Sequence, residues 1–118
     1  MEERRRFVRL DTRLQLAYTV LPTAHPSETL TKNIGGGGIC LFTDSVLKAG
    51  TRLEVTMTLP DQKAPIRFTA EVIWSEAYEL ISGGKAQHSV ESGIEFVAIA
   101  PEDQAAILRH VILTLKPA

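Results

Sequence analysis

The chain has 118 residues, a hydrophobic fraction of 44% and a charged fraction of 23%, the size and composition of one globular domain with its own core. These values exclude a chain that is disordered throughout, and a formal net charge of -1 gives no overall attraction to nucleic acid or to an anionic membrane. No apolar stretch approaches the ~20 residues that span a bilayer, and no signal peptide follows the basic N-terminus, so we expect a cytoplasmic protein with no membrane insertion.

The first segment along the chain is basic. Arg4, Arg5, Arg6 and Arg9 account for four of the 13 Lys and Arg residues. A guanidinium group donates paired hydrogen bonds to a phosphate or to a guanine edge, and its face stacks on a purine. Taken alone, however, this segment is explained equally well as a solvated basic tail.

Alternation of apolar and polar residues predicts most of the remaining chain to be β-strand. The alternation runs over 14–20, 52–59, 66–75 and 94–96, and it places Phe68, Trp74 and Phe96 on apolar strand faces. Turn signals at 22–27, 48–50, 60–62 and 82–84 separate these runs. Short strands at this spacing predict a sandwich or a barrel. The segment 78–87 is either a plain hairpin loop or a contact for a partner.

The C-terminus has a helical pattern instead. Pro101 stands in the first turn of the predicted helix, and Glu102 and Asp103 lie near the positive end of its dipole. One apolar stripe recurs at helical spacing and comprises Ala105, Leu108, Val111, Ile112 and Leu115. We expect this stripe to pack on the barrel or to cover one of its mouths.

A run of glycines stands between two of the predicted strands. Gly35 to Gly38 are entropically costly to order, which indicates a tight turn, a bulge or the close approach of a ligand to the backbone, although a flexible hairpin loop explains them as simply. Their spacing fits neither a Walker loop nor a Rossmann fingerprint. Cys40, the single cysteine, lies in an apolar run and is interpreted as a small core residue.

Together, the basic segment and the glycine run resemble the PilZ domain family. Its signature is RxxxR, matched here by Arg5 and Arg9, followed at the correct spacing by [D/N]xSxxG, matched by Asn33 and Gly38. The sequences of segments 47–53, 72–74 and 93–96 are also similar to those of the family, so the resemblance covers essentially the whole chain. It implies a single all-β domain over 1–118. This domain would have an arginine switch segment (1–10), a six-stranded antiparallel barrel (11–98) and a C-terminal α-helix (101–115).

The resemblance also implies a function, that of a bacterial effector that binds cyclic di-GMP, changes conformation and signals to an unidentified output protein. The ligand-binding residues would be Arg5, Arg9, Asn33, Gly35 and Gly38, joined by Arg4 and Arg6. In the family the residue before RxxxR influences whether one ligand or a stacked pair binds, and Arg4 is similar to the stacked-pair case. No cofactor is implied, and the chain would be a monomer or a homodimer.

One position departs from the family pattern and leaves an alternative open. Gly35 stands where the family has a serine that helps to hold a guanine, and losing one neutral hydrogen bond costs about 0.5–1.5 kcal/mol. The alternative is a PilZ-like protein-interaction module that no longer binds cyclic di-GMP. An OB-like nucleic-acid binder is disfavoured by an aromatic content of 6%. His25, His88 and His110 have no metal-ligand spacing and no catalytic constellation is visible, so we expect neither a metal site nor an enzyme.

Overall fold

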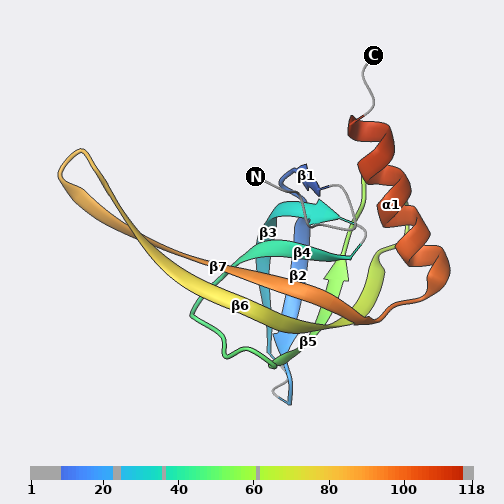
Figure 1. Cartoon of the computed structure of the whole chain (residues 1–118), viewed down its shortest axis with the longest axis horizontal. Helices are drawn as coiled ribbons and strands as arrows, with labels where there is room; N and C mark the ends of the chain where they lie inside the picture. Colours follow the sequence, from blue (N-terminus) through green and yellow to red (C-terminus); the bar gives the residue numbers. More distant parts are fainter. Residues whose placement is uncertain (1–8, 23–24, 36, 61, 116–118) are drawn as a thin grey trace, which may run out of the picture.

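The structure, a computed structural model that describes residues 9–22, 25–35, 37–60 and 62–115, is a closed barrel of six antiparallel strands with one helix at its end (Figure 1). The elements are β1 (Arg9–Asp11), β2 (Gln15–Val20), β3 (Pro26–Gly35), β4 (Gly38–Thr43), β5 (Arg52–Met57), β6 (Ile66–Ser82), β7 (Lys85–Ala98) and α1 (Pro101–Leu115). The strand order is β3-β2-β5-β6-β7-β4, and pairing of β4 with β3 closes the barrel. The predicted fold class is confirmed.

Strands β1 and β2 lie along the same edge of β3 and are separated by a short interruption. β1 pairs with the end of β3 and β2 pairs with its beginning. At the interruption the buried hydroxyl of Thr31 donates to the Thr12 carbonyl (2.5 Å) and accepts from the Leu14 N–H (2.9 Å). A buried backbone group without a hydrogen-bond partner is costly. The Thr31 side chain supplies a partner to both backbone groups, so the strand pairing can be interrupted here without that cost.

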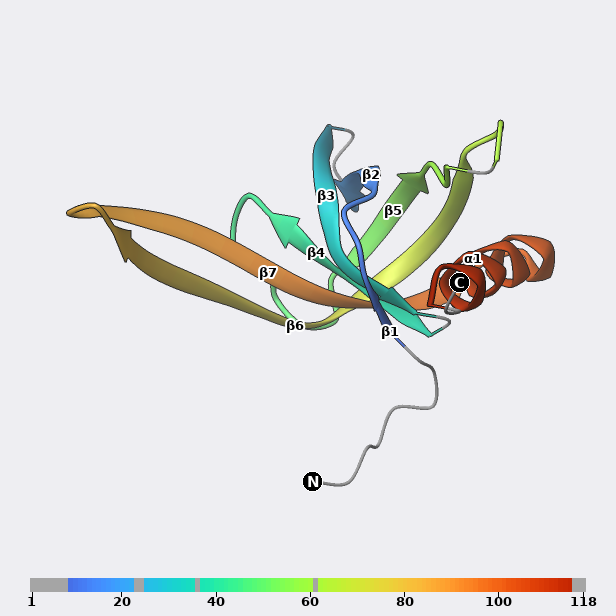
Figure 2. The ribbon, with the colours of Figure 1, turned by 90° about the horizontal axis from the view of Figure 1, so that it is seen from above.

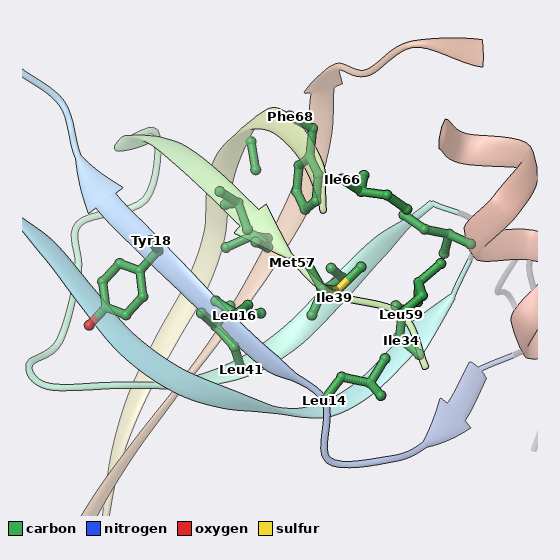
Figure 3. Close-up of a cluster of buried hydrophobic side chains, with 14 of the residues drawn as sticks. Leu14, Leu16, Tyr18, Ile34, Ile39, Leu41, Met57, Leu59, Ile66 and Phe68 are labelled. Atoms are coloured by element: carbon green, nitrogen blue, oxygen red, sulfur yellow. The ribbon is translucent and has the colours of Figure 1, made fainter. Parts of the chain in front are cut away.

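The core of the barrel is built from the inward-facing residues of every barrel strand (Figure 3). In β2 and β5 the predicted alternation is observed, with Leu16, Tyr18, Val55 and Met57 all buried. Tyr18 lies at one side of the core, and its hydroxyl accepts a hydrogen bond from the Asp44 N–H (3.0 Å) (Figure 3). Each fully buried large side chain contributes roughly 1.5–3 kcal/mol, so this cluster is the main source of stability.

Strands β6 and β7 are much longer than the others and continue beyond the barrel as a two-stranded ribbon (Figure 2). Their pairing extends to Ser82 and Lys85, and Gly83 and Gly84 form the turn with positive φ values of 59° and 78°. Segment 78–87, considered above as a possible loop, is therefore strand at both sides of a two-residue turn. The turn signal at 82–84 was correct, but the strands on both sides of the turn were not predicted from the sequence.

The helix α1 packs on one end of the barrel through a face that differs from the predicted stripe. Ala106, Ile107 and Val111 are buried and join the core, whereas Ala105 is exposed and Ile112 is 54% exposed. The prediction of the stripe is correct at Val111, holds in part at the half-buried Leu108, and is wrong at Ala105 and Ile112. This helix carries apolar residues on more than one face. Among the described elements, α1 packs mainly against β1 and β3, and it therefore buries only a narrow face. Among the described residues, no helix is long and apolar enough to cross a membrane.

Candidate functional site

The pairing of β1 with β3 brings the two sequence motifs together. Arg9 is the register partner of Gly35, and Asp11 is the partner of Asn33. The last residue of the RxxxR segment, Arg9, therefore lies beside the end of the strand that carries the second motif, and Figure 2 shows β1 next to β3. Arg4, Arg5 and Arg6 lie outside the described residues, and Arg9 is placed here by its backbone.

Two β-bulges lie on the strands that flank the β4–β7 pair. In β3 the register passes from Thr31 to Asn33 while β4 advances by one residue, so Lys32 is the extra residue. In β6 the register passes from Val72 to Trp74 while β7 advances by one, so Ile73 is the extra residue. A bulge turns neighbouring side chains to the same face of a sheet and is common beside functional sites.

The two bulges share one row of the sheet. Asn33 pairs with Cys40, Cys40 with Gly93, and Gly93 with Trp74. Because Ile34, Ile39 and Ile94 are core residues, alternation places this row on the outer surface of the barrel. The two middle residues of this row, Cys40 and Gly93, are small. The amide of Asn33 stands at one end of the row and the indole of Trp74 at the other.

Trp74 was predicted to lie on the apolar face of its strand, and that prediction is wrong. Its side chain is 40% exposed, and Ile73 beside it is 47% exposed. The indole lies over Gly93, where a Cβ atom would overlap its ring. The extra residue of the bulge reverses the inward–outward alternation after Val72, which a count of period two along one strand cannot reveal.

The glycines of the second motif differ in what they do. Gly38 pairs with Glu95, and a Cβ atom there would overlap the carbonyl oxygen of Ile94. Gly38 is therefore required by the close approach of β4 to β7, whatever binds outside. Gly35 ends β3 and pairs with Arg9, so no side chain separates the arginine segment from the end of this strand.

Two cations that sequence analysis did not select lie on the same outer surface. Lys32 donates to Glu91 at 2.9 Å, and this hydrogen bond raises the pKa of the Lys32 ammonium, so Lys32 stays charged across the neutral range. The guanidinium of Arg13 donates to the Lys32 carbonyl (2.8 Å) and stands 5.4 Å from the ring centre of Phe42. Lys32 immediately precedes Asn33, and this adjacency to the motif was the one signal available for it.

Other chemistry in the described part of the chain is sparse. Cys40 is 4% exposed, as expected for a small buried residue, although it is not part of the main hydrophobic cluster. Across the described ranges, no three His, Cys, Asp or Glu side chains are arranged to hold a metal ion. All buried side-chain polar atoms described there have hydrogen-bond partners. What the described outer surface offers beside the second motif is an exposed indole at Trp74 together with the charged groups of Lys32 and Arg13.

A closed six-stranded antiparallel barrel with a helix at one end defines the class of small β-barrel domains to which this chain belongs. The chain belongs to the PilZ domain family, whose model matches residues 3–113. A comparison with curated protein sequences gave no match.

Solved structures share this fold at low sequence identity. The PilZ domain of YcgR from Escherichia coli, described with c-di-GMP, is 17% identical with a TM-score of 0.76, and the match covers 94% of this chain and 91% of that one. The Bacillus subtilis inhibitor of motility MotI/DgrA is 24% identical with a TM-score of 0.73, and 98% of this chain matches 54% of it. The K. pneumonia MrkH–c-di-GMP complex is 17% identical with a TM-score of 0.75, and 97% of this chain matches 52% of it. This chain therefore spans about half the length of the last two.

Proposed function

We propose that this PilZ domain is a cytoplasmic receptor for cyclic di-GMP, rather than an enzyme, and that it binds the ligand on the outer face built by β1, β3, β4, β7 and β6. The observation that carries the proposal is the β1–β3 register, which sets the end of RxxxR against the second motif at Gly35 and Asn33. Family membership supports it, as do the YcgR and MrkH structures, which are described with this ligand.

In this proposal each group on the face has a role set by its chemistry. Arg5 and Arg9 donate to the phosphates and guanine edges, with Arg4 and Arg6 adding positive charge. Asn33 exchanges hydrogen bonds with one guanine edge, and Gly35 lets the ligand approach the backbone. At the other end of the row, the exposed indole of Trp74 provides a stacking surface for a guanine.

The glycine at position 35 sets the expected strength of binding. A serine hydroxyl there would add a hydrogen bond of about 0.5–1.5 kcal/mol, so its absence weakens binding by roughly threefold to tenfold. The charge-assisted contacts of the arginines remain. Gly35 is also the feature that favours the second candidate function, a protein-interaction module without ligand.

Signalling follows from the position of the arginine segment. It joins the barrel through β1, which has three residues, so contacts with the ligand reposition the segment relative to the barrel without rebuilding the barrel. The altered surface is then recognised by an output protein. The likeness to an inhibitor of motility makes a motility protein one class of output to test.

The test is calorimetric titration of cyclic di-GMP into the wild-type chain and into Arg9→Ala, with GTP and cyclic di-AMP as control ligands. We expect specific binding at micromolar concentration or tighter that Arg9→Ala abolishes, and a stoichiometry of two ligands per chain if Arg4 acts as inferred. Trp74 is the one tryptophan in the chain, so a change in intrinsic fluorescence during the same titration reports on its end of the row.

Absence of binding by the wild-type chain at about 1 mM ligand would reject the receptor function. The variant Gly35→Ser then tests whether the missing motif hydroxyl is the reason that the wild-type chain does not bind. Recovery of binding in this variant assigns the wild-type chain to the interaction modules, because only the motif hydroxyl was missing.

A further inference from the structure

The two ends of the outer row are too far apart for one side chain to contact both guanines. Asn33 and Trp74 are separated by three strand-to-strand steps, through Cys40 and Gly93. At about 4.8 Å per step their backbones stand roughly 14 Å apart. The Trp74 indole itself lies over Gly93, two steps or roughly 10 Å from the backbone of Asn33. Polar groups closer to Gly93 than Asn33 are therefore the first candidates to contact the edge of a guanine stacked on this indole.

Four carboxylates surround Trp74 and Gly93 on this face, and three of them already have partners. Glu91 accepts from Lys32, Glu76 accepts from the Tyr78 hydroxyl (2.8 Å), and Glu71 pairs with Arg52 (3.2 Å). Among the described residues, the fourth, Glu95, has no ion pair and no side-chain hydrogen bond. It is exposed, and its oxygens are available to donors from outside.

The neighbours of Glu95 leave room for a ligand and favour a donor. On one side it pairs with Gly38, which has no side chain to fill the adjacent surface. On the other side it stands directly opposite Glu71, and like charges in that position destabilise a sheet. Hydrogen-bond donors placed at Glu95 relieve this repulsion.

We propose that Glu95 is a specificity-determining residue that recognises the guanine stacked on Trp74, an inference that rests on the proposed cyclic di-GMP function. Glu95 lies two residues beyond Gly93 on the same face of β7, about 6.6–6.8 Å along the strand, within the length of a purine stacked on the indole that covers Gly93. Its two oxygens accept from the guanine N1–H and the exocyclic 2-amino group, a paired and charge-assisted arrangement. Adenine has no donor at either position, so the same carboxylate rejects it.

The experiment compares cyclic di-GMP with cyclic di-IMP, which lacks the 2-amino group, by calorimetry on the full chain. The wild-type chain is expected to prefer cyclic di-GMP by about tenfold or more, as for a lost hydrogen bond to a charged group. Glu95→Gln is expected to lose about tenfold in cyclic di-GMP affinity and most of this preference. Glu76→Gln is the matched control, because it removes the same charge from the same face and should retain both.

Stability distinguishes recognition from a structural role. Because Glu95 opposes Glu71, Glu95→Gln is expected to be at least as stable as wild type in urea unfolding, so that affinity falls while stability does not. A Glu95→Gln chain that binds cyclic di-GMP as well as wild type, with the preference over cyclic di-IMP intact, overturns the inference and leaves the receptor function standing. A wild-type chain that binds neither ligand overturns both.

Discussion

Replacing Thr31 by valine tests whether a single hydroxyl holds the interruption between β1 and β2. Valine keeps the shape of the side chain, but it leaves the Leu14 N–H without its 2.9 Å partner and the Thr12 carbonyl without its 2.5 Å partner. Leaving a buried donor unsatisfied costs about 1–3 kcal/mol, and the part-buried carbonyl adds roughly 0.5–1.5 kcal/mol. Allowing for the better burial of a methyl group, we expect a loss of about 2–3 kcal/mol in the free energy of unfolding.

Urea unfolding followed by circular dichroism measures this loss, with Thr31→Ser as the matched control. Serine keeps the hydroxyl and removes one methyl group, a change of about 0.8 kcal/mol by area. With a slope of about 1–3 kcal/mol per molar urea, the valine variant should unfold at a midpoint lower by roughly 0.7–3 M. A Thr31→Val chain as stable as Thr31→Ser would refute the reasoning, because the hydroxyl would then contribute nothing to the interruption.

Three further substitutions test other parts of the face. Gly38→Ala forces a Cβ atom against the backbone of Ile94 and should lower the free energy of unfolding by about 1–3 kcal/mol in urea; an unchanged midpoint would contradict the close approach. Trp74→Ala should weaken cyclic di-GMP binding in calorimetry by roughly tenfold to a hundredfold, whereas Trp74→Phe should retain most of it; equal affinities of wild type and Trp74→Ala would exclude stacking. Lys32→Met breaks a surface ion pair and should lose less than about 1 kcal/mol of stability in urea unfolding, a difference expected to vanish near 1 M NaCl; a larger, salt-insensitive loss would indicate another role.

The parts of the fold that could be predicted from sequence are those in which one strand has one buried and one exposed face. Leu16 and Tyr18 in β2, and Val55 and Met57 in β5, are buried as their alternation requires. Each of these strands has a regular register with both of its neighbours, so period two applies along its whole length. The motif spacing was informative for a related reason, because it reflects the distance along the chain between two paired strands.

The features that were not predicted depend on partners that a single strand or helix does not reveal. The bulge at Ile73 exists only relative to β7, and it moves Trp74 from the core to the outer face. In α1 both faces are apolar, and the geometry of the barrel end decides that Ile107 is buried and Ile112 is not. The availability of Glu95 depends on which neighbouring carboxylates are already paired, and that too is a property of the assembled sheet.

The short pairing of β1 has a consequence for local opening. β3 keeps its partners β2 and β4 when β1 leaves, so detaching the residue pairs of 9–11 does not open the barrel. Native-state hydrogen exchange at these amides should therefore proceed by a local fluctuation well below the global unfolding free energy, while amides of β5 and of the barrel part of β6 (66–72) exchange through global unfolding. A ligand that holds the arginine segment would slow hydrogen exchange at β1 selectively. Ligand binding on the outer face would therefore lower the fraction of molecules in which β1 is detached from β3.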